Sequence, residues 1–197
     1  YHVNLLALNK TGLKNLFKLV SLANTTYISK TPRIPRRIIE EHREGLLVGS
    51  GCYRGEVFYM AETRNEEILK KVIDFYDYVE VQPPEVYEHL VWGHDINSDK
   101  DVKMCINKII KCTKEAGKMI VATGDVHHIS RDDKLYREII VNQKVPGGGR
   151  HPLARVLDHY HKIPSQHFRT TDEMLNDFSF LDEELRKEIV ITNPKKI

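Results

Sequence analysis

Short apolar runs recur along the chain, and each is followed by a longer segment with helical periodicity. Four runs have the length and composition of buried strands: 3–8, 46–50, 78–82 and 119–123. Helical stripes follow them at 11–23, 35–44, 65–77 and 98–116. Strands separated by helices of this length pair in parallel. The pattern therefore predicts an α/β fold built from βα units.

Turn and cap residues support these boundaries. Thr11 is expected to cap the first helix, and Ser98 stands where the longest helix begins. Gly117 follows that helix at the position where glycine ends a helix. Ser130 and Asp133 resemble a capping box for a further helix.

The character of the chain changes after about residue 142. Residues 146–149 read Pro-Gly-Gly-Gly, and a histidine-rich stretch follows. Two more helices are expected, near 171–178 and 182–192. We therefore divide the chain into an α/β domain, 1–145, and a mostly helical connecting arm, 146–197.

Composition indicates a globular protein and argues against several other classes of protein. Of the 197 residues 41% are apolar and the formal net charge is +2, which excludes intrinsic disorder and argues against a free-standing nucleic-acid binder. No apolar run approaches the roughly 18 residues of a membrane span, and no secretory signal opens the chain. Three cysteines without C-x-x-C spacing indicate a reducing, cytoplasmic setting. The chain begins with Tyr1 rather than Met, so we expect a piece of a longer polypeptide.

Candidate chemistry lies at the ends of two predicted strands. Cys52 follows the second strand, and Asp125 and His127 follow the fourth. Loops at the carboxyl ends of parallel strands converge on one edge, and thiolate, carboxylate and imidazole suit zinc, manganese or iron. In an extended Asp-x-His segment both side chains point to the same side. These three residues therefore predict a shared metal site.

Less specific interpretations remain open for each residue. Cys52 suits a small buried apolar position, Asp125 could cap a turn, and His127 could be a buried imidazole with its hydrogen bonds satisfied. His128 faces away from His127 and is a weaker candidate. His151, His159, His161 and His167 are expected to be exposed or paired with carboxylates. Lys10, Lys14 and Lys18 are expected to form a solvated helix face.

An ordered set of motifs resembles a known family. The motifs are Tyr1–Asn9 with Gly12–Leu16, Ser50–Cys52 with Gly55–Phe58, Val121–His127, and Phe168–Leu175. Together they resemble the PHP (polymerase and histidinol phosphatase) domain. Arg33–Arg36 and Phe178–Leu181 are most similar to PolC-type bacterial DNA polymerase III alpha subunits. The resemblance covers nearly the whole chain.

The resemblance implies a distorted (β/α)7 barrel that holds two or three divalent metal ions, zinc or manganese. The positions that match the family's ligands are His2, Cys52, Asp125 and His127. In PolC-type enzymes a 3'-5' exonuclease domain is inserted in the barrel, so the chain would be the C-terminal part of the PHP domain. His2 precedes its predicted strand, whereas parallel βα units place ligands after strands.

The function implied for the parent protein is DNA-directed DNA synthesis, with magnesium in a palm domain beyond Ile197. DNA, other domains of the polypeptide and the sliding clamp would be its partners. We identify no palm carboxylates here, assign no catalytic residue, and leave residues that bind nucleic acid open. The segment would be a metal-stabilised scaffold or would hydrolyse phosphodiesters. The alternative is part of a free-standing phosphoesterase of the histidinol-phosphatase type, which has no need of the arm 146–197.

Overall fold

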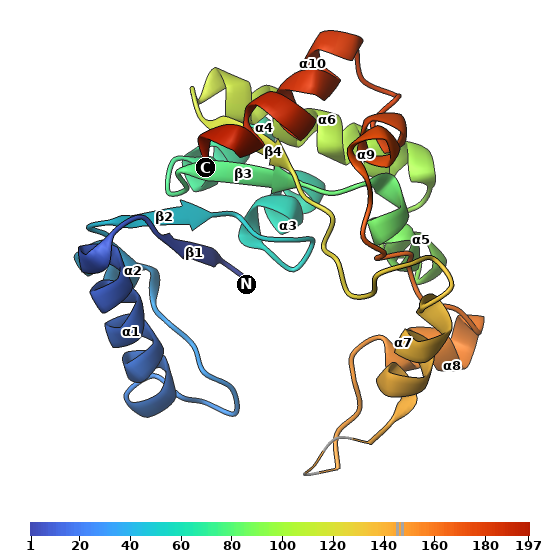
Figure 1. Ribbon diagram of the computed structural model, residues 1–197, viewed down its shortest axis with the longest axis horizontal. Helices are drawn as coiled ribbons and strands as arrows, with labels where there is room; N and C mark the ends of the chain where they lie inside the picture. The colour runs from blue at the N-terminus through green and yellow to red at the C-terminus, as the bar shows by residue number, and fades with distance from the viewer. Residues whose placement is uncertain (145, 147) are drawn as a thin grey trace.

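A single four-stranded sheet forms the centre of the protein. The computed structural model describes residues 1–144, 146 and 148–197. The strands are β1 (Asn4–Ala7), β2 (Leu46–Gly49), β3 (Tyr78–Val81) and β4 (Met119–Ala122), in the order β1-β2-β3-β4. The predicted domain boundary falls at residue 145, outside the described residues. The α/β class is confirmed, with helices between the strands (Figure 1).

The direction of β1 differs from the prediction. β2, β3 and β4 are parallel as expected, but β1 runs antiparallel to β2, with Asn4 opposite Gly49 and Ala7 opposite Leu46. Parallel pairing was therefore wrong for β1. The strand is also largely exposed rather than buried, because within the described sheet only β2 pairs with it.

Ten α-helices are described, joined by three single-turn segments. They are α1 (Lys10–Thr25), α2 (Arg36–Glu41), α3 (Glu56–Thr63), α4 (Glu66–Ile73), α5 (Glu88–Trp92), α6 (Asp99–Glu115), α7 (Lys134–Asn142), α8 (Ala154–Tyr160), α9 (Thr171–Asp177) and α10 (Glu183–Lys187), with η1 (Pro84–Tyr87), η2 (Glu188–Thr192) and η3 (Pro194–Lys196). The sequence pattern missed α3, α5 and α8. Each is short, so its apolar period is weak.

Two of the predicted helix starts can be compared with the structure. Ser98, near which the longest helix was expected to begin, is the N-cap of α6, since its hydroxyl accepts from the backbone N–H of Asp101. Asn9, not Thr11, caps α1, because its side chain accepts from Gly12 N at 2.9 Å. The helix therefore begins earlier than expected.

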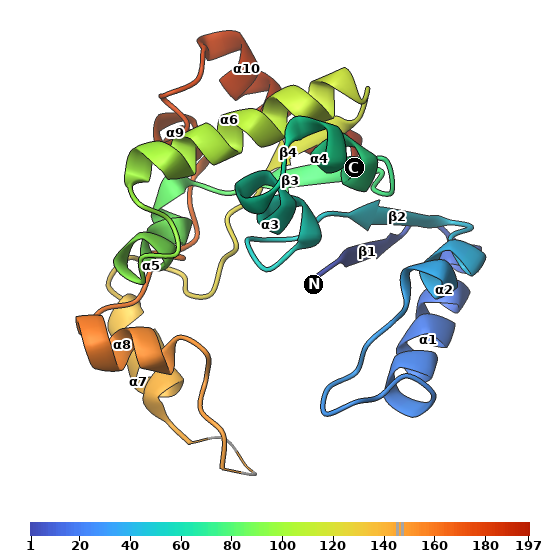
Figure 2. The same cartoon turned by 180° about the vertical axis from the view of Figure 1, so that it is seen from behind.

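The main core lies between the sheet and helices α4 and α6 (Figure 2). Val79, Ile106 and Ile120 are among its fully buried members. Phe178 and Ile189 belong to the same core, although they lie in the predicted arm. The segment from α9 onward therefore packs back onto the sheet, where η2 contacts β4.

A second, smaller core joins α7 to α8. Val141 of α7 packs with Leu153, Ala154 and Ile163. The two helices extend from the sheet at the end opposite α1 and α2 (Figure 1). The small core formed by α7 and α8 therefore begins before the predicted domain boundary at residue 145 and ends well before residue 197.

Helix α1 buries only one of its two apolar sides. Leu19 and Ala23 are buried, whereas Phe17 and Val20 of the predicted stripe are 65% and 52% exposed. No described helix has the length and apolar character needed to cross a membrane.

Packing of the C-terminal segment can be tested at Phe178, which is completely buried. We expect Phe178→Ala to lower the free energy of unfolding by about 3–5 kcal/mol, the usual loss for a buried aromatic ring. Phe168→Ala is the matched control, because Phe168 is 62% exposed, and it should cost less than about 0.5 kcal/mol. Denaturant titration measures both. Equal small losses would mean that the segment does not contribute to the core.

The pH dependence of stability can be tested at His89. Burial lowers the pKa of His89 to about 4, below its ordinary 6.5. Between pH 6.5 and 4 the unfolded chain binds a proton that the folded chain does not, so stability falls as pH falls. The slope is up to about 1.4 kcal/mol per pH unit, and the whole loss is about 3 kcal/mol.

The variant His89→Phe should make this part of the profile flatter while keeping the aromatic contact with Tyr53, whose ring centroid lies 4.6 Å away. Urea titrations of both proteins across this pH range measure the difference. Identical slopes of unfolding free energy against pH in the two proteins would mean that His89 does not cause this pH dependence.

Candidate metal centre

His2 and Cys52 lie together at the carboxyl end of β2. The His2 Nδ1 atom is 3.7 Å from the Cys52 Sγ atom. Antiparallel pairing places Asn4 opposite Gly49, so His2 extends past the carboxyl end of β2. There its backbone N–H donates to Arg54 O at 3.0 Å. A residue before β1 therefore reaches the same edge as residues after β2. This explains how His2 can match a ligand although it precedes its strand.

Asp125 and His127 follow β4, and a turn rather than an extended segment brings them together. Asp125 has φ +44°, in the left-handed region, which costs about 1 kcal/mol and which Asp tolerates better than most residues. Its Oδ1 atom lies 4.0 Å from His127 Nδ1. The alternation argument was therefore wrong for this segment, although the two side chains are neighbours.

The tautomer of His127 follows from its hydrogen bond. Nδ1 lies 2.8 Å from the backbone oxygen of Asp125, and a carbonyl oxygen only accepts, so Nδ1 carries the proton. The lone pair is then on Nε2. Histidine ligands of metals commonly donate the other ring N–H to a carbonyl in this way.

Electrostatic effects connect the two pairs. Burial raises the pKa of the Cys52 thiol, and the negative charge of Asp125 adds to the rise. Burial lowers the pKa of His2, as does the positive charge of Arg54, while Asp125 opposes this. The carboxylate of Asp125 is therefore close enough to act on both residues.

The fit to a cation is partial. A tetrahedral zinc ion with one sulfur and one nitrogen ligand separates them by about 3.6 Å, close to the observed 3.7 Å between Cys52 and His2. Within the described residues, no three His, Cys, Asp or Glu side chains are arranged to hold an ion by themselves. A cavity of about 960 Å³ opens beside His2 and is lined by Arg33 and Arg54.

Glu80 is a site residue that the sequence analysis missed. It is a carboxylate in the middle of β3 and only 8% exposed. Asn4 donates to it at 2.6 Å and Thr123 at 3.0 Å. Burial raises the pKa of Tyr78 to about 12, with help from the Glu80 charge. A charged residue inside an apolar strand is the signal that could have revealed it.

Gln166 is a second missed residue and touches Asp125 directly. Its Nε2 donates to Asp125 Oδ2 at 2.7 Å. Its backbone oxygen accepts from His127 N at 2.8 Å. Sequence spacing gave no indication, because 41 residues separate Gln166 from Asp125.

The other histidines have structural explanations. Both ring nitrogens of His128 are engaged, Nδ1 by Ser130 O at 2.7 Å and Nε2 by Gln166 N at 3.3 Å. This agrees with its weaker claim as a ligand. His151 Nδ1 accepts from Leu153 N at 3.1 Å. His167 was expected to be exposed or paired with a carboxylate. It is 2% exposed, its Nδ1 lies 3.0 Å from the hydroxyl of Ser165, and its Nε2 lies 4.0 Å from the carboxylate of Glu173.

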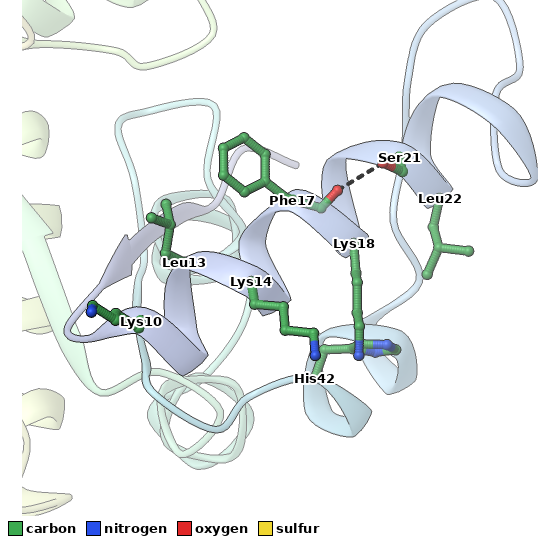
Figure 3. A pocket seen from close by; sticks show the side chains of 8 residues that line it. All are labelled: Lys10, Leu13, Lys14, Phe17, Lys18, Ser21, Leu22 and His42. Carbon is green, nitrogen blue, oxygen red and sulfur yellow. Dashed lines mark hydrogen bonds between the residues drawn. The ribbon is translucent and has the colours of Figure 1, made fainter.

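A separate hollow of about 740 Å³ lies along α1, and none of the four predicted ligands lines it. Lys14 and Lys18 extend toward His42, while Leu13 and Phe17 lie on another side of the helix (Figure 3). The prediction that the lysines are solvated agrees with the positions of these side chains. The hollow therefore has no direct relation to the candidate metal centre.

The chain is similar to known proteins, both to a domain family and to whole proteins. Residues 1–84 match the PHP domain family. The whole chain is 50% identical over 197 residues to DNA polymerase III PolC-type of Bacillus subtilis (strain 168). It is 44% identical over 196 residues to the protein of that name in Bacillus cereus, and 41% identical over 201 residues to that of Streptococcus sanguinis.

These matches cover all of this chain but only 13% to 14% of each relative. The resemblance found from the motifs is thereby confirmed: residues 1–84 match the PHP domain family, and the chain is similar over its full length to one part of PolC-type DNA polymerase III.

Proposed function

We propose that this chain is a segment of a PolC-type replicative DNA polymerase, where it forms part of a metal-binding PHP domain with a mainly structural role. The 50% identity to a polymerase over all 197 residues carries the proposal. The similarity includes 146–197, the part that a free-standing phosphoesterase of the histidinol-phosphatase type would not need. That alternative is therefore less well supported.

In this proposal the four strands are the C-terminal part of a distorted seven-stranded barrel. The edge position of β1 supports it, because Leu6 and Leu8 are 40% and 56% exposed, and apolar strand edges are normally covered. Strands elsewhere in the polypeptide, before an inserted exonuclease domain, would extend the sheet from β1.

His2, Cys52, Asp125 and His127 would hold zinc or manganese, with the remaining ligands supplied by the rest of the polypeptide. The separation of His2 and Cys52 and the tautomer of His127 support this. When bound, the cation would offset the negative charge of Asp125 and could polarise a phosphoryl oxygen. Arg33 and Arg54, which line the cavity beside His2, would attract an anion there.

The whole enzyme would use magnesium in its palm for DNA synthesis and would act in the cytoplasm on DNA, with the sliding clamp as a partner. This segment alone would not polymerise. Two roles for the PHP domain itself remain, scaffold and metal-dependent phosphodiester hydrolysis. We favour the scaffold because the parent would have a dedicated exonuclease.

The two roles can be distinguished with the double variant Asp125→Asn, His127→Asn in the complete polypeptide. For a scaffold we expect lower metal content and a melting temperature lower by several degrees, because two ligands are lost. Manganese-dependent release of nucleotides from DNA should not change in an exonuclease-inactive background. Elemental analysis, thermal melting and a nucleotide-release assay measure the three quantities.

His94→Asn is the matched control, since His94 is exposed and also has a positive φ of 60°, which Asn tolerates. Loss of nucleotide release with the fold intact would make the PHP domain a nuclease. Unchanged metal content and melting temperature in the double variant would contradict metal binding at these residues.

A further inference from the structure

Gln166 lies between the C-terminal part of the chain and the loop after β4. Its side chain is buried, at 2% exposure. The amide nitrogen is 2.7 Å from Asp125 Oδ2. The Asp125 side chain is 17% exposed, and this hydrogen bond favours one rotamer of it, because any other rotamer would leave the buried amide N–H of Gln166 without this acceptor.

The orientation of the amide is itself determined. Arg137 of α7 donates to Gln166 Oε1 at 3.3 Å. A guanidinium group only donates, so the amide oxygen must face Arg137 and the NH2 group must face Asp125. Turning the amide by 180° would place a donor against Arg137 and an acceptor against a carboxylate. Both contacts would then be lost.

The backbone of Gln166 holds the same loop from a second direction. Its carbonyl oxygen accepts from His127 N at 2.8 Å and from His128 N at 3.3 Å. Two hydrogen bonds with Gln166 therefore hold the loop at Asp125, which has a left-handed backbone conformation. One is made to the Asp125 side chain and the other to the backbone N–H of His127.

The segment that carries Gln166 is held in place by a buried cation. Arg169, whose side chain is 1% exposed, bonds to Asp177 at 2.5 Å and to Glu85 at 2.9 Å. It also donates to the backbone oxygen of His167 at 3.2 Å. The position of Gln166 thus depends on contacts with α9 and η1 as well as on the loop it touches.

From these contacts we infer that Gln166 is a positioning residue for the metal centre: it holds the Asp125 carboxylate, and through its carbonyl the His127 backbone, in the direction a cation requires. The inference rests on the proposed metal-binding function. Residues that orient a ligand in this way typically affect metal affinity 10- to 100-fold.

The test uses Gln166→Leu in the complete polypeptide, with cobalt(II) as the metal probe. Leucine keeps the approximate volume and the backbone carbonyl but removes the donor to Asp125. We expect cobalt affinity at this centre to fall about 10- to 100-fold. The thiolate-to-cobalt charge-transfer band, identified by its loss in Cys52→Ser, should remain at saturation.

Gln143→Leu is the matched control, because Gln143 is exposed and has no side-chain contact with the candidate metal centre. Equal affinities of Gln166→Leu and the parent would overturn the inference and leave the proposed function standing. A parent protein without the Cys52-dependent band would overturn the proposed function, and the inference with it. If Gln166→Leu loses the band and melts earlier while Gln143→Leu does not, Gln166 is merely structural and the inference fails.

Discussion

The antiparallel pairing of β1 with β2 is the constraint on which the rest of the candidate site depends. In a sheet of parallel strands only the residues after each strand reach the carboxyl edge. Because β1 runs in the opposite direction, the residue before it reaches that edge too. His2 is therefore beside Cys52 although β1 and its following helix separate them in sequence. If β1 were parallel, its ligand would lie at the far end of the sheet.

Polar contacts within the sheet reinforce this register. Glu80 of β3 accepts hydrogen bonds from Asn4, the first residue of β1, and from Thr123, the residue after β4. One buried carboxylate therefore connects β3 with β1 and with the end of β4. A buried carboxylate is costly unless it is well bonded, which gives the arrangement specificity as well as stability. A register shift of one residue in β1 would move Asn4 to the other face and leave Glu80 without this donor.

The sequence predicted the parts of the fold that depend on local pattern. The four strands were placed within one residue at each end, and the start of the longest helix near Ser98 was found, because apolar runs and helical periods are read from neighbouring residues. The direction of β1 was not predicted, since alternation of strand and helix carries no information on a strand that reverses. The loop at Asp125 was misread as extended for a related reason: Asp125 has a positive φ and is bonded to Gln166, which is far away in sequence.

The predicted ligands could be read from local sequence, whereas the residues that hold them depend on contacts between distant parts of the chain. Cys52, Asp125 and His127 could be found because chemistry at a strand end leaves a local signature. Gln166 has none. Its contact depends on a segment that Arg169 joins to Glu85 and Asp177 and that pairs with the loop at His128 and His167. Removing one partner of a buried ion pair costs several kcal/mol, so that attachment is stable against small changes. The C-terminal part therefore completes the loop that carries two of the predicted ligands, and it is more than a connection between domains.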